Sequence, residues 1–204
     1  MSEPLTLALP KGRLFDNVQK HFATKGIEFS FEKRKLTAYD SQGLLKIFLV
    51  KNSDLPTYVN YGIAGLGVCG DDVVYESGLK FNNLLPFDFG GTKICLCGPK
   101  GIGEKSDLDG LRIATSYTEF TKDFFHNEGT PVKIINLNGS VELAPILGLT
   151  PYIVDLVETG STLKANNLEV IRTLSDIKVN LIANPSYYKT NYEKINKLIE
   201  ILRD

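Results

Sequence analysis

Short apolar runs with strand-like and helix-like periods alternate along this chain of 204 residues, and this alternation most constrains its fold. The runs that predict strands are residues 5–9, 44–50, 66–69, 93–97, 111–115, 132–137, 152–157 and 179–183. The segments that predict helices are residues 14–22, 54–61, 120–127, a short stretch after 140, 159–166 and 192–202. Strands that alternate with helices in this way indicate an α/β fold with largely parallel sheets.

The composition excludes several classes of function. At 43% hydrophobic, the chain can bury a substantial core, either as one domain or as two small lobes. Its 23 basic and 24 acidic residues give no basic field for non-specific binding to nucleic acid. No run approaches the roughly 18 apolar residues of a membrane span. The N-terminus lacks the basic start and longer apolar run of a signal peptide. We therefore expect a cytoplasmic protein that binds neither nucleic acid nor membranes.

Cysteine and histidine are scarce, which limits the chemistry available. The odd number of cysteines, Cys69, Cys95 and Cys97, favours free thiols in a reducing compartment, and core packing is favoured over metal binding. His21 and His126 fall inside predicted helices, away from every strand end. A Ser-His or Cys-His nucleophile is therefore not expected. Any reaction would depend on binding, charge and magnesium.

The most informative segment, residues 153–163, runs from an apolar strand through a hydroxyl-rich turn into a helix. Main-chain N–H groups there, with the hydroxyls of Thr159, Ser161 and Thr162, would form an anion site. Gly160 would let the main chain approach the ligand closely. The alternative is an ordinary helix start capped by Ser or Thr.

Acidic residues follow two of the predicted strands. Asp155 and Glu158 flank the hydroxyl loop, where carboxylates suit ribose hydroxyls or a magnesium ion. Asp71 and Asp72 follow the strand at 66–69 and could bind a metal or ribose. Equally, they could cap a helix over residues 73–76.

Basic residues occur where the first strand should meet the first helix. Lys11 and Arg13, around Gly12, oppose the helix dipole by about 0.3–1 kcal/mol per charge. A bound anion would explain this locally unfavourable choice, and side chains that simply reach solvent are the alternative. The cluster of residues 33–35, which includes Arg34, is typical of a solvated hairpin surface.

Several of these motifs resemble the ATP phosphoribosyltransferase family. The family signature is matched by Glu142, Gly148, Ile153, Asp155, Thr159, Gly160, Thr162 and Leu163. Further similar segments are residues 9–13, 54–59, 70–76, 112–117 and 138–145, so the resemblance covers about residues 5–185. Three positions depart from the family: Thr150, interpreted as a packing change, Ser116 in place of Lys, and Lys51 in place of Arg. Lys51 offers a phosphate a point charge where Arg offers a planar fork.

The resemblance implies a two-lobed fold like that of type II periplasmic binding proteins, with a cleft between the lobes. Residues 1–88 plus 179–204 would form the first lobe and residues 89–178 the second, with a crossing near Gly90 and Gly91. A weak internal similarity in the sequence is consistent with two equivalent halves. Gly62 precedes a strand that ends near Asp72, and Gly148 precedes one that ends near Gly160.

The resemblance also implies the first step of histidine biosynthesis, in which N1 of ATP attacks phosphoribosyl pyrophosphate and displaces pyrophosphate. ATP would be bound by Lys11, Gly12, Arg13, Arg34 and Asp72. The catalytic cations would be Arg13, Arg34 and Lys51, assisted by Mg²⁺ whose ligands are unassigned. Phosphoribosyl pyrophosphate would be bound by Asp155, Glu158, Thr159, Gly160, Ser161, Thr162 and Leu163.

The resemblance is to the short form of the family, whose members pair with a subunit related to histidyl-tRNA synthetase. Since the chain stops at Asp204, we expect no built-in histidine-binding domain, and a small homo-oligomer, a dimer, for the chain alone. The rival interpretations are a solute-binding protein of the same fold, a different phosphoribosyltransferase and an inactive regulatory subunit. The intact loop hydroxyls and the motifs at residues 9–13 and 138–145 favour the ATP-using enzyme.

Overall fold

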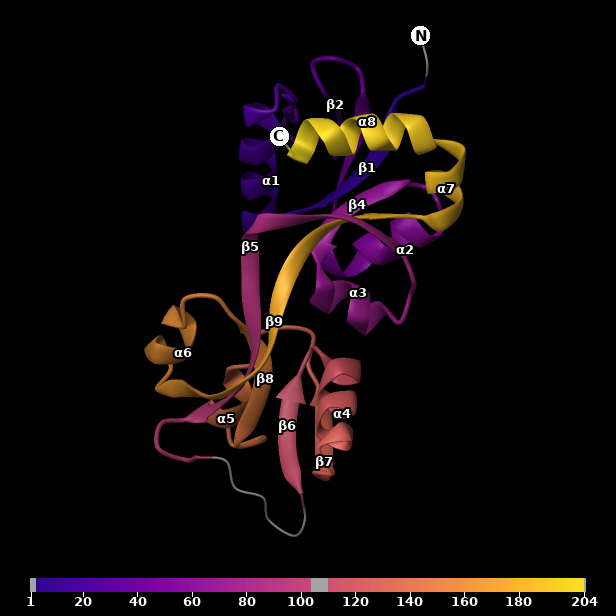
Figure 1. The fold of residues 1–204 in the computed structure, drawn as a ribbon. Coiled ribbons are helices and arrows are strands. Elements are labelled where there is room, and N and C mark those ends of the chain that lie inside the picture. The colour runs from indigo at the N-terminus through magenta and orange to yellow at the C-terminus, as the bar shows by residue number, and fades with distance from the viewer. Residues whose placement is uncertain (1–2, 104–109, 204) are drawn as a thin grey trace. The chain divides into compact units, whose positions relative to one another are not determined.

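The computed structural model describes residues 3–103 and 110–203, and the chain divides into two compact units (Figure 1). Unit 1 comprises Met1–Gly90 and Lys178–Asp204, and unit 2 comprises Gly91–Ile177. Both boundaries fall inside long strands, β5 (Asn82–Pro99) and β9 (Leu168–Ala183).

In unit 1 the central strand is β1 (Leu5–Pro10). It pairs in parallel with β3 (Leu45–Val50) on one side and with β4 (Leu66–Gly70) on the other. The short β2 (Thr37–Tyr39) runs antiparallel to β3, and β9 runs antiparallel to β4. Every residue of β4 is buried, as expected of a parallel strand covered on both faces.

Helices cover both faces of the unit 1 sheet. Apolar residues of α1 (Arg13–Thr24) and α8 (Tyr192–Arg203) pack in one core against Leu5, Leu7 and Leu9 of the central strand. Ala8, on the other face of that strand, belongs to the opposite core. The opposite core contains residues of α2 (Leu55–Asn60) and α3 (Asp71–Ser77). The remaining helix, α7 (Pro185–Thr190), begins after Asn184, whose side chain accepts hydrogen bonds from two of its first N–H groups.

In unit 2 the central strand is β6 (Leu111–Thr115), parallel to both of its neighbours. These are β7 (Val132–Asn136) on one side and β8 (Tyr152–Val157) on the other, and β5 runs antiparallel to β8. Three helices follow the strands: α4 (Thr118–Asn127), α5 (Leu143–Ile146) and α6 (Ser161–Ala165). One core packs around Phe125 of α4, and the other includes Leu163 of α6.

Each unit contains a topological switch point, at which successive connections leave the central strand on opposite sides. In unit 1 the chain passes from β1 to β3 and then to β4 on the other side of β1. In unit 2 it passes from β6 to β7 and then to β8 on the other side of β6. Ligands of open α/β sheets bind at the carboxyl ends of strands beside such points. The topology therefore predicts one binding site per unit, beside β1 and β4 and beside β6 and β8.

Most predicted elements are confirmed, and the differences have local causes. The strands predicted at 93–97 and 179–183 are the last parts of two much longer strands, β5 and β9. The prediction missed their first parts because the residues there are only partly buried and do not form a continuous apolar run. Strand β2 has three residues, too few for a periodic signal. Helix α2 begins at Leu55, after a 3₁₀ turn at Asn52–Asp54, and α6 begins at Ser161, two residues later than predicted.

The predicted core packing of the cysteines is confirmed. All three thiols are free and buried, and burial raises the pKa of the Cys97 thiol to about 12. Among the described residues, no helix is long and apolar enough to cross a membrane.

Candidate functional site

The switch point of unit 1 begins with the basic segment after β1. Lys11, Gly12 and Arg13 are all exposed, and the Lys11 N–H donates to the Val50 carbonyl of β3 at 3.0 Å. Gly12 is the N-cap of α1 with a φ of 99°, a conformation that other residues rarely adopt. No side chain caps α1 in the part of the chain that the structure describes. The Phe15 N–H donates to the Gly12 carbonyl at 3.0 Å, and the positive dipole end of the helix lies in the segment that carries Lys11 and Arg13.

The other two predicted cations lie at the same edge of the sheet. Lys51 directly follows β3, whose last residue pairs with Pro10 of β1. Arg34 lies in a turn closed by a hydrogen bond from the Lys35 N–H to the Glu32 carbonyl, at 2.9 Å. That turn precedes β2, whose first residue pairs with Phe48 near the carboxyl end of β3. The structure thus brings the basic residues predicted from three separate segments to one edge of unit 1.

The acidic pair after β4 does not cap α3, so that alternative is wrong. Gly70 is the N-cap, and Asp71 and Asp72 occupy the first turn of the helix. Asp71 accepts a hydrogen bond from the Asn180 amide at 2.6 Å. Asp72 is only 3% exposed, and one of its carboxylate oxygens has no hydrogen-bond partner among the described residues. Burial raises the pKa of Asp72 to about 6, although main-chain hydrogen bonds oppose the shift.

The switch point of unit 2 contains the hydroxyl loop after β8. Gly160 is the N-cap of α6 with a φ of 70° and, as a glycine, has no side chain to cap the helix. The hydroxyls of Thr159 and Ser161 lie 3.1 Å apart, and both residues are exposed with Thr162. Leu163 is 5% exposed and packs in the core, so only its main chain can reach a ligand. The N-cap is a glycine, but the Thr159 hydroxyl accepts a hydrogen bond from the Ser161 N–H at 3.4 Å, so the helix start retains part of the capping of the alternative interpretation while the loop presents three hydroxyls.

A pair of carboxylates lies beside this loop. Asp155 is half-buried and accepts a hydrogen bond from the Leu156 N–H at 2.8 Å. Burial raises its pKa to about 6, and the negative charge of Glu142 contributes in the same direction. Glu142 precedes α5 and is half-buried. It begins the family signature, yet it was not predicted to be a site residue. Its proximity to Asp155 depends on how the β7–α5–β8 connection packs, since the sequence predicts the elements of that connection but not their arrangement in space.

Thr150 confirms its interpretation as a packing position. The residue is buried, and its hydroxyl hydrogen bonds with the Arg112 carbonyl of β6. It also accepts a hydrogen bond from the Tyr152 N–H at 3.3 Å, so it links the starts of β6 and β8.

Comparisons with known proteins identify the relatives of this fold and of these loops. A family model described as ATP phosphoribosyltransferase matches residues 51–204. The ATP phosphoribosyltransferase of Thermoanaerobacter sp. (strain X514) is 42% identical over 99% of this chain and 96% of its own length. That of Caldicellulosiruptor bescii is 47% identical over 91% of each chain. The solved ATP phosphoribosyl transferase (HisG:HisZ) complex from Thermotoga maritima matches with a TM-score of 0.84 and 37% identity, covering 98% of this chain and 96% of that one.

More distant structures show the fold alone. The alkanesulfonate-binding protein SsuA of Xanthomonas axonopodis pv. citri matches with a TM-score of 0.62 at 12% identity, covering 98% of this chain and 72% of that one. This likeness confirms the predicted fold of the type II periplasmic binding proteins.

Proposed function

Because this chain belongs to the ATP phosphoribosyltransferase family, we propose that its two switch points bind the two substrates separately. The reaction joins N1 of ATP to C1 of phosphoribosyl pyrophosphate, releases pyrophosphate and is the first step of histidine biosynthesis. The observation that supports the division is chemical. The switch point of unit 1 carries the basic residues, beside the acidic pair after β4, and that of unit 2 combines hydroxyls, a glycine turn and carboxylates.

Phosphoribosyl pyrophosphate is assigned to unit 2. Its 5-phosphate would accept hydrogen bonds from the main chain at Gly160 to Leu163 and from the hydroxyls of Thr159, Ser161 and Thr162. Asp155 and Glu158 would accept hydrogen bonds from the ribose hydroxyls. They would do so best when ionised, because an ionised carboxylate only accepts and its hydrogen bonds are stronger, whereas protonation turns one of its oxygens into a donor.

ATP and the departing pyrophosphate are assigned to the basic edge of unit 1. The residues that would bind ATP are Lys11, Gly12, Arg13, Arg34 and Asp72. Arg13, Arg34 and Lys51 would neutralise charge on the leaving group. N1 of adenine carries a neutral lone pair at pH 7, so no strong base is needed to create the nucleophile. Catalysis then consists of positioning and electrostatic stabilisation.

Magnesium fits the donor set of unit 2 as a substrate-bound ion. Mg²⁺ in such sites usually binds one or two carboxylates together with substrate phosphates. Asp155 and Glu142 supply two such carboxylates beside the loop, while no cluster of three or more protein ligands occurs among the described residues. When bound, the ion would neutralise pyrophosphate charge.

Pyrophosphate release tests the proposed function. The purified chain is mixed with ATP, phosphoribosyl pyrophosphate and Mg²⁺, and release should require both substrates. Adenine in place of ATP is the control for a different phosphoribosyltransferase. Binding of a substrate without any turnover would support a solute-binding protein instead.

The assembly is proposed on the same basis. The Thermotoga maritima relative was solved as a two-component complex. We propose that this chain likewise pairs with a subunit related to histidyl-tRNA synthetase, in the cytoplasm, and that alone it forms a dimer. Light scattering with and without that subunit measures both masses.

A further inference from the structure

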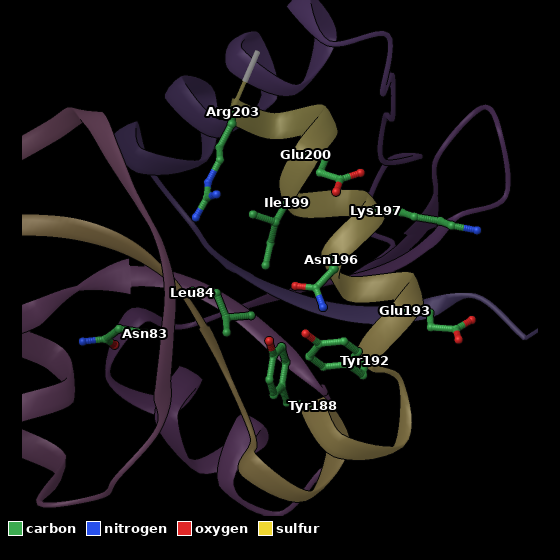
Figure 2. A pocket seen from close by; sticks show the side chains of 10 residues that line it. All are labelled: Asn83, Leu84, Tyr188, Tyr192, Glu193, Asn196, Lys197, Ile199, Glu200 and Arg203. Carbon is green, nitrogen blue, oxygen red and sulfur yellow. The ribbon is translucent and has the colours of Figure 1, made fainter.

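Two grooves lie along the flanks of helix α8 in unit 1 (Figure 2). The first, of about 600 Å³, is bordered by α7, α8 and the start of β5. In Figure 2, Tyr188, Tyr192 and Ile199 gather on its inner side. The second, of about 240 Å³, is more apolar and is lined by Leu44 and Ile201 among others. Lys197 lines both grooves, so together they form one surface, here called the α8 surface.

The α8 surface carries charges of both signs. Glu193, Lys197, Glu200 and Arg203 follow one another at intervals of three or four residues, with alternating sign. Such intervals allow ion pairs within a helix, but none joins these four residues in the described part of the chain. Figure 2 shows the side chains of Glu193 and Lys197 extending away from the groove. The charges are therefore available to a second molecule with the opposite pattern.

The composition of the α8 surface suits a different subunit better than a second copy of this chain. Interfaces that form reversibly are about as polar as ordinary surface and are enriched in Tyr and Arg, whereas interfaces between identical chains are more apolar. The α5 region of unit 2 is the more apolar surface and so better fits an interface between identical chains. Its exposed residues are Leu143, Ile146, Leu147 and Leu149. In size, the residues that line the two grooves approach the roughly 20 residues per side of a standard interface.

We propose that the α8 surface is where a separate regulatory subunit docks, through complementary charges and a side chain inserted beside the tyrosines. The inference rests on the two-subunit assembly of the proposed function. None of the residues assigned to ATP or phosphoribosyl pyrophosphate lines either groove. The partner would therefore act on catalysis without contacting these residues in the grooves, and its affinity would fall as salt screens the charges.

The test measures binding of the second subunit of the Thermotoga maritima complex to this chain by interferometry. Lys197→Glu, Arg203→Glu and Tyr192→Ala should each weaken binding by roughly tenfold or more. The matched controls are Lys133→Glu, the same charge change at an exposed position of unit 2, and Leu147→Ser on the α5 region. Both controls should bind as the wild type does. Pyrophosphate release by the chain alone should be unchanged in every variant.

Four outcomes would overturn the proposal. The wild type fails to bind, the α8 variants bind normally, or Leu147→Ser abolishes binding while they do not. A fall in the mass of the chain alone in Lys197→Glu would also overturn it, because the surface would then join two copies. Melting temperatures exclude misfolded variants. Failure of the proposed function is separate, since it appears as absent pyrophosphate release by the isolated wild type.

Discussion

The main-chain conformation of Gly160 shapes the hydroxyl loop of unit 2. Its φ of 70° lies in the left-handed region, and a Cβ placed on it would meet Val157 at 3.8 Å, an ordinary contact distance. Space inside the fold therefore does not require glycine here. The backbone conformation does, and so would a phosphate that lies close to the turn.

We expect Gly160→Val to abolish measurable binding of phosphoribosyl pyrophosphate while the fold remains intact. The branched side chain disfavours the turn and occupies the space that the phosphate needs. Calorimetry on the folded variant gives the affinity. Gly129→Val is the matched control, since Gly129 has a φ of 69° and open space but lies at the end of α4. Undiminished affinity in Gly160→Val would reduce the loop to a helix start.

Asp155 is a carboxylate whose environment opposes its charge. Burial and, secondarily, Glu142 raise its pKa to about 6. As the pH falls through about 6, Asp155 becomes protonated, so its hydrogen bonds to the ribose hydroxyls weaken and one of its oxygens becomes a donor.

Catalytic efficiency for phosphoribosyl pyrophosphate should accordingly fall on the acid side with an apparent pKa near 6. Glu142→Gln removes the like charge, so the pKa of Asp155 should fall and the acid limb should move to lower pH. The move should be partial, because burial is the larger cause. A pH series of initial rates with both proteins measures this shift. An acid limb that does not move would mean that Glu142 does not raise the pKa of Asp155.

Asp72 should cost stability at neutral pH. Its folded pKa of about 6 exceeds the ordinary 3.8, so the folded state favours the protonated form. The benefit of protonation is present at low pH and is lost as the pH rises from about 4 through 6. At pH 8 the free energy of unfolding of Asp72→Asn should therefore exceed that of the wild type by at most about 3 kcal/mol, as measured by denaturant unfolding. At pH 4 the difference should vanish. Equal stability at pH 8 would mean that the carboxylate has a partner in solution.

At the scale of elements, the chain uses the same arrangement twice. In unit 1 a helix, Gly62, the strand β4 and the helix α3 follow in order. In unit 2 a helix, Gly148, the strand β8 and the helix α6 do the same. Both glycines have a positive φ, near 70°, where the chain leaves the preceding helix. The weak internal similarity in the sequence therefore corresponds to equivalent elements, and each leads into a candidate binding loop.

Arg13 is the first residue of α1 and tests whether that helix start serves a ligand. Cations are unfavourable at a helix N-terminus, where the dipole prefers an anion. We expect Arg13→Ala to lower pyrophosphate release strongly while the melting temperature without ligand stays the same or rises slightly. Lys20→Ala, an exposed cation further along the same helix, is the matched control for activity. A lower melting temperature with full activity would give Arg13 a structural role.

For the whole molecule, the two switch points lie in different units, and none of the site residues lines the grooves of the proposed partner surface on unit 1. Regulation by a separate subunit would then be a coupling between distinct sites. We expect histidine to inhibit the chain little by itself and more after the second subunit is added, as the assembly grows. Activity titrations with histidine, beside light scattering, check both statements. Strong inhibition of the isolated chain would place an effector site within these residues.

The sequence alone determined the fold class, the family and the residues to consider. Apolar runs in parallel strands are buried on both faces, so they are continuous and easy to recognise, as in β1 and β4. Gly160 and the hydroxyls around it could be proposed as site residues from the sequence because their chemistry is local, in adjacent residues at the end of one strand. The same locality explains Lys11, Gly12 and Arg13.

Only the tertiary structure decided how distant segments combine. It placed Arg34 and Lys51 at the edge that carries Lys11, because β2 and β3 pair in a register that the sequence does not state. It buried Asp72 although its neighbour Asp71 remains accessible, since the first turn of a helix points adjacent side chains in different directions. It set Glu142 beside Asp155 through a crossover connection. Burial and pairing between remote residues depend on packing, and packing is a property of the folded chain.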